Sequence, residues 1–343
     1  MYKYMTQNIY GGKNCSQITC LSCGKVSNRY EDTLFLSVEV KNMKTLNDSL
    51  DKLACEEKID GYQCEGCKQK VTISKRNIIA SLPNVLIVHL QRICYNFEFD
   101  HNEKINSRLV FPRRLNMKQY TIEDISNKNG AQNETDEIYY KCDDYYDYYL
   151  VGVIVHVGSA DSGHYYSYIN TVRDGNGNIA RYDIKNEKMT KSWLEFNDSS
   201  ISKFNVENLE EECFGGVSNE KERGGMMFSW GRGEKCKNAY MLVYERKIKK
   251  PMKIVITDKT SVQDNPNVIS YKQEERAAIM KKYDLTRYYG TNEYEEKCNE
   301  LYQSVFYDVE KDEYYKYVPF YYNNRMIPKE YYMKVVNAPF ENI

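Results

Sequence analysis

Two closely spaced cysteine pairs constrain this chain more than any other feature of its sequence. They are Cys20-Leu-Ser-Cys23 and Cys64-Glu-Gly-Cys67, and each follows residues that can form a strand. A glycine within or beside each pair favours a tight turn, on which backbone amides can point at the sulfur atoms. Four thiolates on two such turns are the ligand set of a closed, tetrahedral structural zinc site. The sequence therefore predicts that these four cysteines bind zinc, with four unrelated thiols as the less favoured alternative.

The distance between the two pairs also limits the fold around them. About 40 residues separate Cys23 from Cys64, which is more than in an ordinary zinc ribbon. The interval must therefore contain structure of its own. Neither pair opens a long amphipathic helix, which counts against a redox-active motif.

Composition and charge narrow the class of protein. The net charge is -1, from 48 basic and 49 acidic residues, whereas a zinc-ribbon nucleic-acid binder usually carries a basic excess. Residues 1–20 contain no apolar run typical of a signal peptide, and no segment approaches the ~20 apolar residues of a membrane span. With 11 cysteines and no such signals, we expect a reduced, intracellular protein of the cytoplasm, the nucleus or both, without membrane or nucleic-acid partners.

Strand patterns dominate the first 247 residues. Apolar runs that alternate with polar residues or are rich in β-branched residues predict strands, and the short Gly-rich turns between them favour antiparallel pairing. Leucines spaced for one helical face predict a helix over residues 45–54. The predicted strands cover residues 33–40, 85–91, 149–157, 163–170, 180–184 and 239–246. These elements predict an α+β fold with a mostly antiparallel sheet.

The remaining stretches differ from these strands in residue composition. Residues 121–148 and 217–237 are polar or Gly-rich, and we predict that both are loop insertions. A basic, proline-containing link follows residue 247. Beyond it, residues 273–282 and 292–306 have helical spacing, while the tyrosine-rich remainder shows no strand pattern. We therefore predict a helical or partly ordered C-terminal appendage over residues 248–343.

Four histidines are candidates for chemistry. His89 and His156 lie within apolar strand patterns, and His101 lies in a polar loop. His164 differs because it follows a Gly-Ser-Ala-Asp-Ser-Gly loop and begins an aromatic strand. By residue type alone, a strand histidine near a turn is more often structural than catalytic.

An orienting group for His164 is present further along the chain. The segment Trp-Leu-Glu-Phe-Asn-Asp ends in Asn197 and Asp198. Either side chain could place an oxygen against the imidazole and fix its tautomer. His164 and one of these two residues would then be the second and third members of a Cys-His-Asn/Asp triad.

Several longer segments carry a family resemblance. In chain order they read GGK-x-x-x-Q-x-x-CLSC, YEDTLFLSVEV, YQCEGCKQKV, LPNVLIVHLQR, YYLVGVIVHVGSADSGHYYSYI, WLEFNDSSIS and NAYMLVYER. In this order, residues from about 9 to 247, roughly two thirds of the chain, resemble the ubiquitin-specific proteases. These are papain-like cysteine deubiquitinases with a thumb, a palm and fingers, and the chain is most similar to the large members with long flanking helical regions.

The resemblance implies a fold and a partner. It implies a partial ubiquitin-specific protease domain over residues 1–247, with zinc-ribbon fingers at about 9–75 and an antiparallel palm sheet at about 76–247, and without the helical thumb. The implied activity is thiol-dependent hydrolysis of the isopeptide bond at the C-terminus of ubiquitin. The implied partners are ubiquitin and ubiquitinated proteins.

The resemblance also implies residue roles. His164 would deprotonate the nucleophile, Asn197 would orient the imidazole, and Asp198 would assist. Gly163 and Tyr165 would flank the channel for the ubiquitin tail. The four cysteines of the two pairs would hold a structural zinc ion in the fingers.

The sequence departs from the family pattern in one important respect. The family begins with a cysteine box resembling G-N-T-C at a helix N-terminus, where the thiol pKa is lowered. No such segment occurs in this chain; Cys15 lies too near the finger, and Cys94, Cys142 and Cys213 follow the finger. We therefore expect the chain alone to be inactive, either as a fragment of a protease or, alternatively, as a ubiquitin-binding pseudoenzyme. A smaller departure is Ile93, where the family commonly has an aromatic residue.

Overall fold

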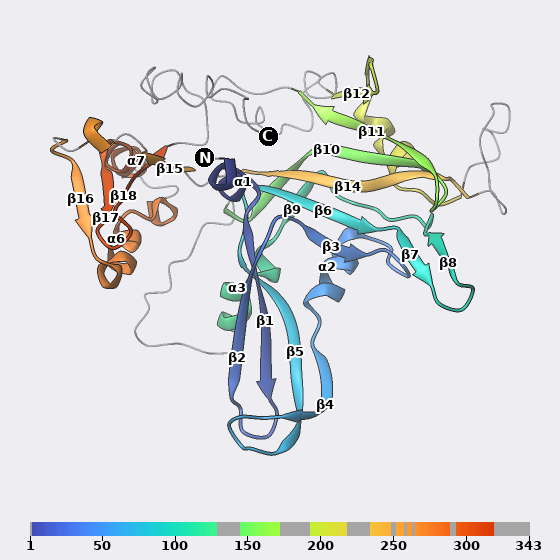
Figure 1. Ribbon diagram of the computed structural model, residues 1–343. Helices are drawn as coiled ribbons and strands as arrows, with labels where there is room; N and C mark the ends of the chain where they lie inside the picture. Colours follow the sequence, from blue (N-terminus) through green and yellow to red (C-terminus); the bar gives the residue numbers. More distant parts are fainter. Residues whose placement is uncertain are drawn as a thin grey trace.

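A computed structural model of the chain describes most of it and is built mainly from strands (Figure 1). The described residues are 2–128, 145–171, 193–217, 234–247, 252–256, 259–262, 265–288 and 293–318. The strands form one sheet of eight, two sheets of four and a two-stranded hairpin. With the helices that pack on them, they confirm the α+β class predicted from the sequence.

The largest sheet, here called the palm sheet, has the order β13-β12-β11-β10-β14-β6-β3, with β9 paired to β10. Its strands are β3 (Leu36–Glu39), β6 (Val85–Gln91), β9 (Arg114–Asn116), β10 (Asp147–Gly158), β11 (Gly163–Asn170), β12 (Trp193–Asn197), β13 (Ser200–Lys203) and β14 (Lys237–Arg246). Every pairing is antiparallel except that of β3 with β6, which is parallel. The chain between β3 and β6 is long enough for this crossover because it passes through a helix and two further strands.

Short helices pack against the sheets. Helix α2 (Leu46–Ala54), within the predicted range, packs against β3 and β5 (Lys70–Ser81), α3 (Ile122–Lys128) packs against β5, and α5 (Leu209–Cys213) packs against β14. Helix α2 begins where a capping box forms: the Asp48 N–H donates to Thr45 Oγ1 (3.1 Å), and the Thr45 N–H donates to an Asp48 carboxylate oxygen (2.9 Å). Leu46 and Leu50 on its inner face are almost completely buried in the main core.

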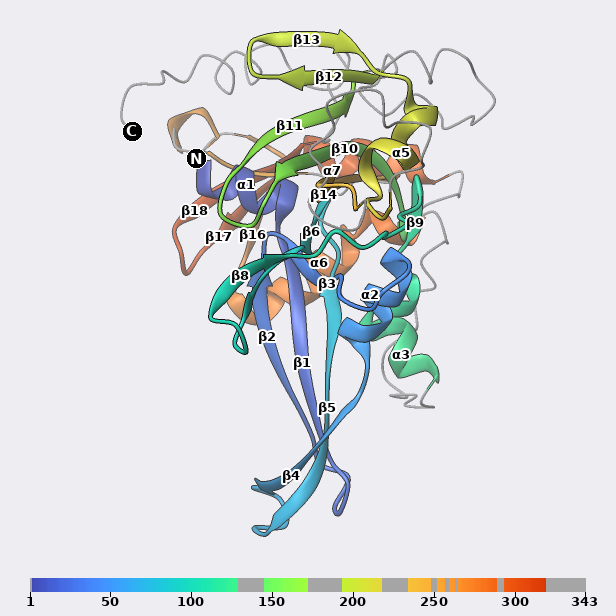
Figure 2. The same ribbon diagram turned by 90° about the vertical axis from the view of Figure 1, so that its right-hand side faces the viewer.

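A second sheet, here called the finger sheet, projects away from the palm (Figure 2). Its order is β2-β1-β5-β4, and all its pairings are antiparallel. The strands are β1 (Gly12–Cys20), β2 (Val26–Thr33), β4 (Glu57–Gln63) and β5 (Lys70–Ser81). Strands β2 and β4 are almost entirely exposed, whereas β1 and β5 each bury several residues.

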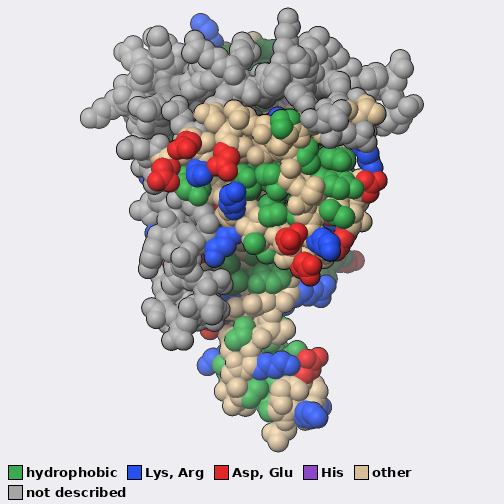
Figure 3. All heavy atoms as spheres, turned by 90° about the vertical axis from the view of Figure 1, so that its left-hand side faces the viewer, with side chains coloured by type: hydrophobic (Ala, Val, Ile, Leu, Met, Phe, Trp, Pro, Cys, Tyr) green, Lys and Arg blue, Asp and Glu red, His purple; other side chains and the backbone are tan. Residues whose placement is uncertain are grey.

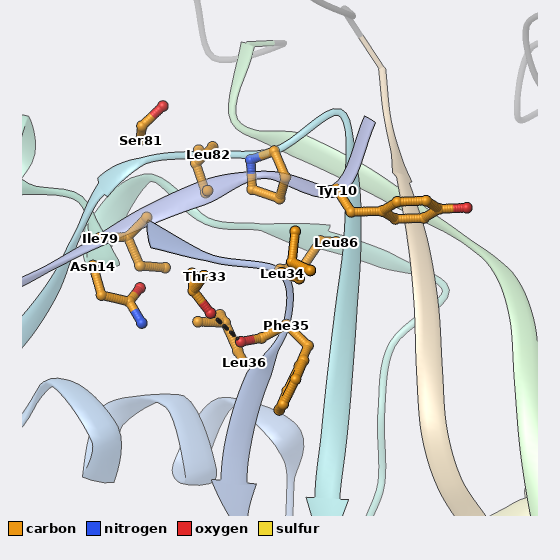
Figure 4. A pocket seen from close by; sticks show the side chains of 12 residues that line it. Tyr10, Asn14, Thr33, Leu34, Phe35, Leu36, Ile79, Ser81, Leu82 and Leu86 are labelled. Atoms are coloured by element: carbon orange, nitrogen blue, oxygen red, sulfur yellow. Dashed lines mark hydrogen bonds between the residues drawn. The ribbon is translucent and has the colours of Figure 1, made fainter. Parts of the chain in front are cut away.

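A small apolar pocket lies where the finger sheet joins the palm (Figure 4). Leu34 and Phe35 line it between β2 and β3, and Tyr10 lines it at the end of α1 (Tyr2–Tyr10). The turn between the strands is fixed by the Thr33 hydroxyl, which donates to the Phe35 carbonyl (2.6 Å).

The C-terminal unit, residues 252–318, corrects the sequence prediction of a mainly helical appendage. It has a four-stranded sheet with the order β15-β18-β17-β16. Its elements are β15 (Met252–Ile256), β16 (Val268–Tyr271), α6 (Arg276–Lys282), α7 (Tyr294–Gln303), β17 (Val305–Asp308) and β18 (Glu313–Val318). The two helices correspond to the predicted ones, but the strands were not predicted.

This unit has its own hydrophobic core and is joined to the palm through α1. Phe306 and Tyr315 stack in that core (centroids 5.4 Å apart). The Asn8 side chain donates to the Lys253 carbonyl (2.8 Å), and the Asn84 side chain donates to the Asn8 carbonyl (3.1 Å). On the outer face of the unit, hydrophobic side chains lie among charged ones of both signs (Figure 3).

The two predicted loop insertions lie only partly within the described residues. The first begins with α3 and ends in buried Tyr145, Tyr146 and Asp147, so its last residues belong to the core. The second begins at Val217, which is bridged to Glu234. Residues 129–144 and 218–233, like the predicted strand at 180–184, lie outside the described part. Within that part, no helix is both long and apolar enough to cross a membrane.

Candidate active site and metal centre

The two cysteine pairs lie together at the tip of the finger sheet. The first joins β1 to β2, and the second joins β4 to β5. Because β1 and β5 are antiparallel, with Cys20 opposite Ile73, both turns fall at the same end of the sheet. The turns match each other: the Gly24 N–H donates to the Cys20 carbonyl (2.9 Å), and the Lys68 N–H donates to the Cys64 carbonyl (2.8 Å).

The sulfur atoms have the geometry of a metal site. All four ligand atoms lie within 4.8 Å of one another; the Cys20–Cys67 pair is 3.9 Å apart and the Cys23–Cys64 pair 3.7 Å. A tetrahedron with zinc–sulfur bonds of about 2.3 Å has edges of about 3.8 Å. The four cysteines therefore fit the zinc site that the sequence predicts.

Backbone amides at the tip favour thiolates. The Cys23 N–H donates to Cys20 Sγ (3.4 Å), and the Gly66 N–H donates to Cys64 Sγ (3.3 Å). The Cys67 and Gly66 amides lower the pKa of Cys64 to about 6. Burial and the neighbouring thiols raise the pKa of Cys67 to about 12, so the fourth thiolate depends on a cation.

The structure brings His164 and Asn197 together although 33 positions separate them. His164 is the second residue of β11, and Asn197 ends the neighbouring strand β12. The distance from His164 Nε2 to Asn197 Oδ1 is 2.7 Å. The imidazole is about half exposed (47%), so a reactant can reach it.

The contacts of Asn197 determine which atom of its amide faces the histidine. Its Nδ2 donates to a Glu195 carboxylate oxygen (3.5 Å), and a carboxylate can only accept. Asn197 Oδ1 therefore faces His164 and accepts from Nε2–H. In this tautomer the lone pair of His164 Nδ1 is available as a base.

Asp198 is placed differently. Its carboxylate lies 3.9 Å from His164 Nε2, beyond hydrogen-bond distance, and its side chain is 79% exposed. The residue has a left-handed backbone (φ 51°) at the turn between β12 and β13.

Gly163 lies where no larger residue fits. A Cβ at this position would fall 2.2 Å from His156 Nε2 and 2.5 Å from the Val157 carbonyl oxygen. His156 is 3% exposed, and its ring packs against Tyr165 (4.6 Å between centroids). Tyr165 is itself 47% exposed and lies beside His164, on the opposite face of the strand.

The other histidines have structural contacts. His89 Nδ1 is 2.8 Å from Ser37 Oγ, and its ring meets Tyr240 edge-on (4.9 Å). His101 is exposed at the start of β8 (His101–Lys104), which pairs with β7 (Ile93–Asn96) in a hairpin. The sequence did not point to Lys104, although its ammonium contacts the backbone that leads to His164. A single lysine in a polar stretch carries no pattern that could have identified it.

A family model for ubiquitin carboxyl-terminal hydrolases matches residues 3–244. The chain belongs to this family. Human ubiquitin carboxyl-terminal hydrolase 34 is 32% identical over 254 residues, which cover 71% of the chain and 7% of that protein.

Other ubiquitin carboxyl-terminal hydrolases are similar to the same extent. Mouse hydrolase 9X is 33% identical over 260 residues, and human hydrolase 24 is 33% identical over 258 residues. These matches cover 71% and 70% of the chain, but 10% and 9% of the relatives. The chain therefore spans a tenth or less of the length of these curated relatives, which are large members of the family, as the sequence predicts.

Among solved structures, the SAGA Ubp8/Sgf11/Sus1/Sgf73 DUB module bound to ubiquitin aldehyde has a TM-score of 0.47 to this hydrolase-family chain. Its sequence identity is 22%, and the match covers 72% of this chain and 43% of that one.

Proposed function

We propose that this chain forms the palm and fingers of a thiol-dependent deubiquitinase that hydrolyses the isopeptide bond at the C-terminus of ubiquitin. The observation that carries the proposal is the His164–Asn197 pair, with a 2.7 Å contact at Nε2 on an exposed imidazole. Membership of the ubiquitin carboxyl-terminal hydrolase family supports it.

In the proposed reaction, His164 Nδ1 takes the proton of a cysteine thiol, and Asn197 Oδ1 accepts a hydrogen bond from Nε2–H of the imidazolium. The thiolate attacks the carbonyl carbon of the terminal glycine of ubiquitin. The imidazolium then returns its proton to the lysine amine that leaves. Water attacks the thioester by the same base catalysis, which releases ubiquitin and restores the thiol.

The substrate-holding parts follow from the same proposal. The zinc-bound finger tip would grip the body of ubiquitin, because zinc joins the two finger turns into one surface. Gly163 and Tyr165 would flank the ubiquitin tail, since they lie on either side of His164. A protease that depends on a thiol and on zinc thiolates needs a reducing compartment, so we expect an intracellular location.

The nucleophile divides this proposal from a second one. Among the residues that the structure describes, no cysteine forms a hydrogen bond with His164. Cys15 and Cys213 are buried, and Cys142 lies outside the described residues. We propose that the thiol comes from a segment outside the described part; the alternative is a pseudoenzyme that binds ubiquitin without cleaving it.

The test uses an electrophilic ubiquitin probe and isotope-labelled ubiquitin with the purified, zinc-loaded chain. We expect binding to ubiquitin but no covalent adduct with the chain alone. Fusion of an upstream cysteine-box segment should produce an adduct that requires His164, as judged with His164→Ala. Binding without an adduct in the fusion supports the pseudoenzyme. The absence of binding in both proteins contradicts the proposed function.

A further inference from the structure

The β7–β8 hairpin is attached to the palm sheet by two cations at its base. Arg92 precedes β7, and Lys104 ends β8. Arg92 is fully buried and donates to the carbonyls of Ala239 (2.8 Å) and Phe214 (3.2 Å), among others. It therefore fixes the hairpin to the first part of β14 and to the residue that follows α5.

Lys104 contacts a different part of the palm. Its ammonium donates to the carbonyl oxygens of His156 (3.2 Å), Gly158 (3.1 Å) and Cys236 (2.5 Å). An ammonium has three N–H donors, and these carbonyls account for all of them. The side chain therefore joins the end of β10 to the residues that lead into β14.

Two of these carbonyls, those of His156 and Gly158, lie where the chain leaves β10 to form the loop before His164. Gly158 has a left-handed backbone (φ 132°) and pairs with Gly163 across the loop. Val157, between two of the bonded carbonyls, is the register partner of His164. Movement of the Gly158 carbonyl would thus be transmitted to the backbone of His164.

The chemistry of the contact argues against a simple stabilising role. Among the described residues, no carboxylate forms an ion pair with Lys104. Burial removes water from the charged form and lowers the pKa of Lys104 to about 8; Cys236 opposes this shift, and the charge of Arg92 adds to it. The cost of burying the ammonium therefore offsets part of what its three hydrogen bonds contribute to stability.

We propose that Lys104 is a positioning residue for the active site: by joining two carbonyls at the end of β10 to the carbonyl that precedes β14, it holds His164 in register with Asn197. The proposal rests on the proposed function for the role of His164. It does not depend on turnover, because the geometry of the His164–Asn197 bond can be measured without ubiquitin.

The test is a double-mutant cycle followed by NMR on the full, histidine-labelled chain, which has only four histidines to assign. The readout is the nitrogen chemical shift of His164 Nε2, which reports the hydrogen bond to Asn197. Asn197→Ala should shift this signal, because it removes the amide oxygen that accepts the bond. In the Lys104→Met background the same change should have less than a third of that effect, since the bond is already displaced.

Two comparisons complete the experiment. Lys104→Arg keeps a cation with several N–H donors and should retain more of the Asn197→Ala effect than Lys104→Met does. Lys104→Met should still fold, with a lower melting temperature because three carbonyls lose a donor. An equal Asn197→Ala effect in the parent and Lys104→Met backgrounds overturns the proposal. So does a Lys104→Met chain that fails to fold while Lys104→Arg folds, because Lys104 would then serve the fold. Loss of ubiquitin binding or hydrolysis alone would count only against the proposed function.

Discussion

Replacement of Gly163 by alanine tests the packing beside the proposed catalytic histidine. The added Cβ would lie 2.2 Å from His156 Nε2, 2.9 Å from His156 Cε1 and 2.5 Å from the Val157 carbonyl oxygen. The His156 ring is buried and has little room to turn. The carbonyl belongs to β10, so relief requires β10 and β11 to move apart.

The cost can be estimated from overpacked protein cores. Extra methyl or methylene groups in well-packed sites cost about 1–3 kcal/mol, and a contact with backbone belongs at the upper end of that range. We expect Gly163→Ala to reduce the free energy of unfolding by about 3 kcal/mol. For a domain of this size, each kcal/mol lowers the melting temperature by about 2–4 °C, so a decrease of about 6–12 °C should follow.

The assay is thermal and urea unfolding of the zinc-loaded chain, with Gly152→Ala as the matched control. Gly152 lies in β10 of the same sheet, and a Cβ there would be 3.5 Å or more from every neighbour, which is ordinary contact. That variant should be neutral or slightly more stable. The reasoning is refuted if Gly163→Ala unfolds within about 0.5 kcal/mol of Gly152→Ala.

Two further predictions concern zinc and pH. The purified chain should contain one zinc ion, and Cys64→Ser should lose the ion and show faster hydrogen exchange in β4 and β5 but not in β10. The control Cys55→Ser, at an exposed thiol outside the quartet, should change neither the zinc content nor the exchange rates. Unchanged zinc content in Cys64→Ser would contradict the site. Burial, followed by the charge of Lys104, lowers the pKa of His156 to about 4, so the unfolded chain, with a histidine pKa of about 6.5, binds the proton first on acidification. The stability that neutral His156 contributes is complete above about pH 6.5 and is lost as the pH falls toward about 4, with about 2 kcal/mol lost at pH 5. Between pH 7 and pH 5, urea unfolding should show a smaller loss of stability in His156→Gln than in the parent chain. An equal loss in both chains would contradict the assignment.

The palm strands could be predicted because their pattern is local. β6 and β11 have the predicted bounds, since β-branched or aromatic runs end at clear turn residues. The parallel pairing of β3 with β6 could not be predicted in this way. It depends on a crossover through α2 and the finger sheet, which no short window of sequence contains.

The strands of the C-terminal unit were hidden by its tyrosines. In β18, Tyr314 stacks on Tyr307 outside the core, while Tyr315 packs inside it against Phe306. Tyrosine suits both environments, so the alternation of inward and outward positions does not appear as an alternation of residue types. The strand is therefore invisible to a hydrophobicity pattern.

The candidate site was predictable to different degrees. The four cysteines could be identified from spacing alone, because two Cys-x-x-Cys pairs are a specific signal. The pairing of His164 with Asn197 was predicted only with the family resemblance, since it joins two strands far apart in sequence. Lys104 could not be found from the sequence, because its role depends on three backbone carbonyls that only the folded palm brings together.

The path of the chain through the finger sheet has a consequence for folding. The chain visits the finger twice, as the β1–β2 hairpin and again as the β4–β5 hairpin, and returns to the palm between them through β3 and α2. The ion therefore closes a loop of 41 to 47 positions between separate hairpins. Closing such a loop costs conformational entropy that neither hairpin can recover alone. Metal capture should accordingly come late in folding, after β1 and β5 have found their register, so that a chain with mispaired strands cannot retain zinc.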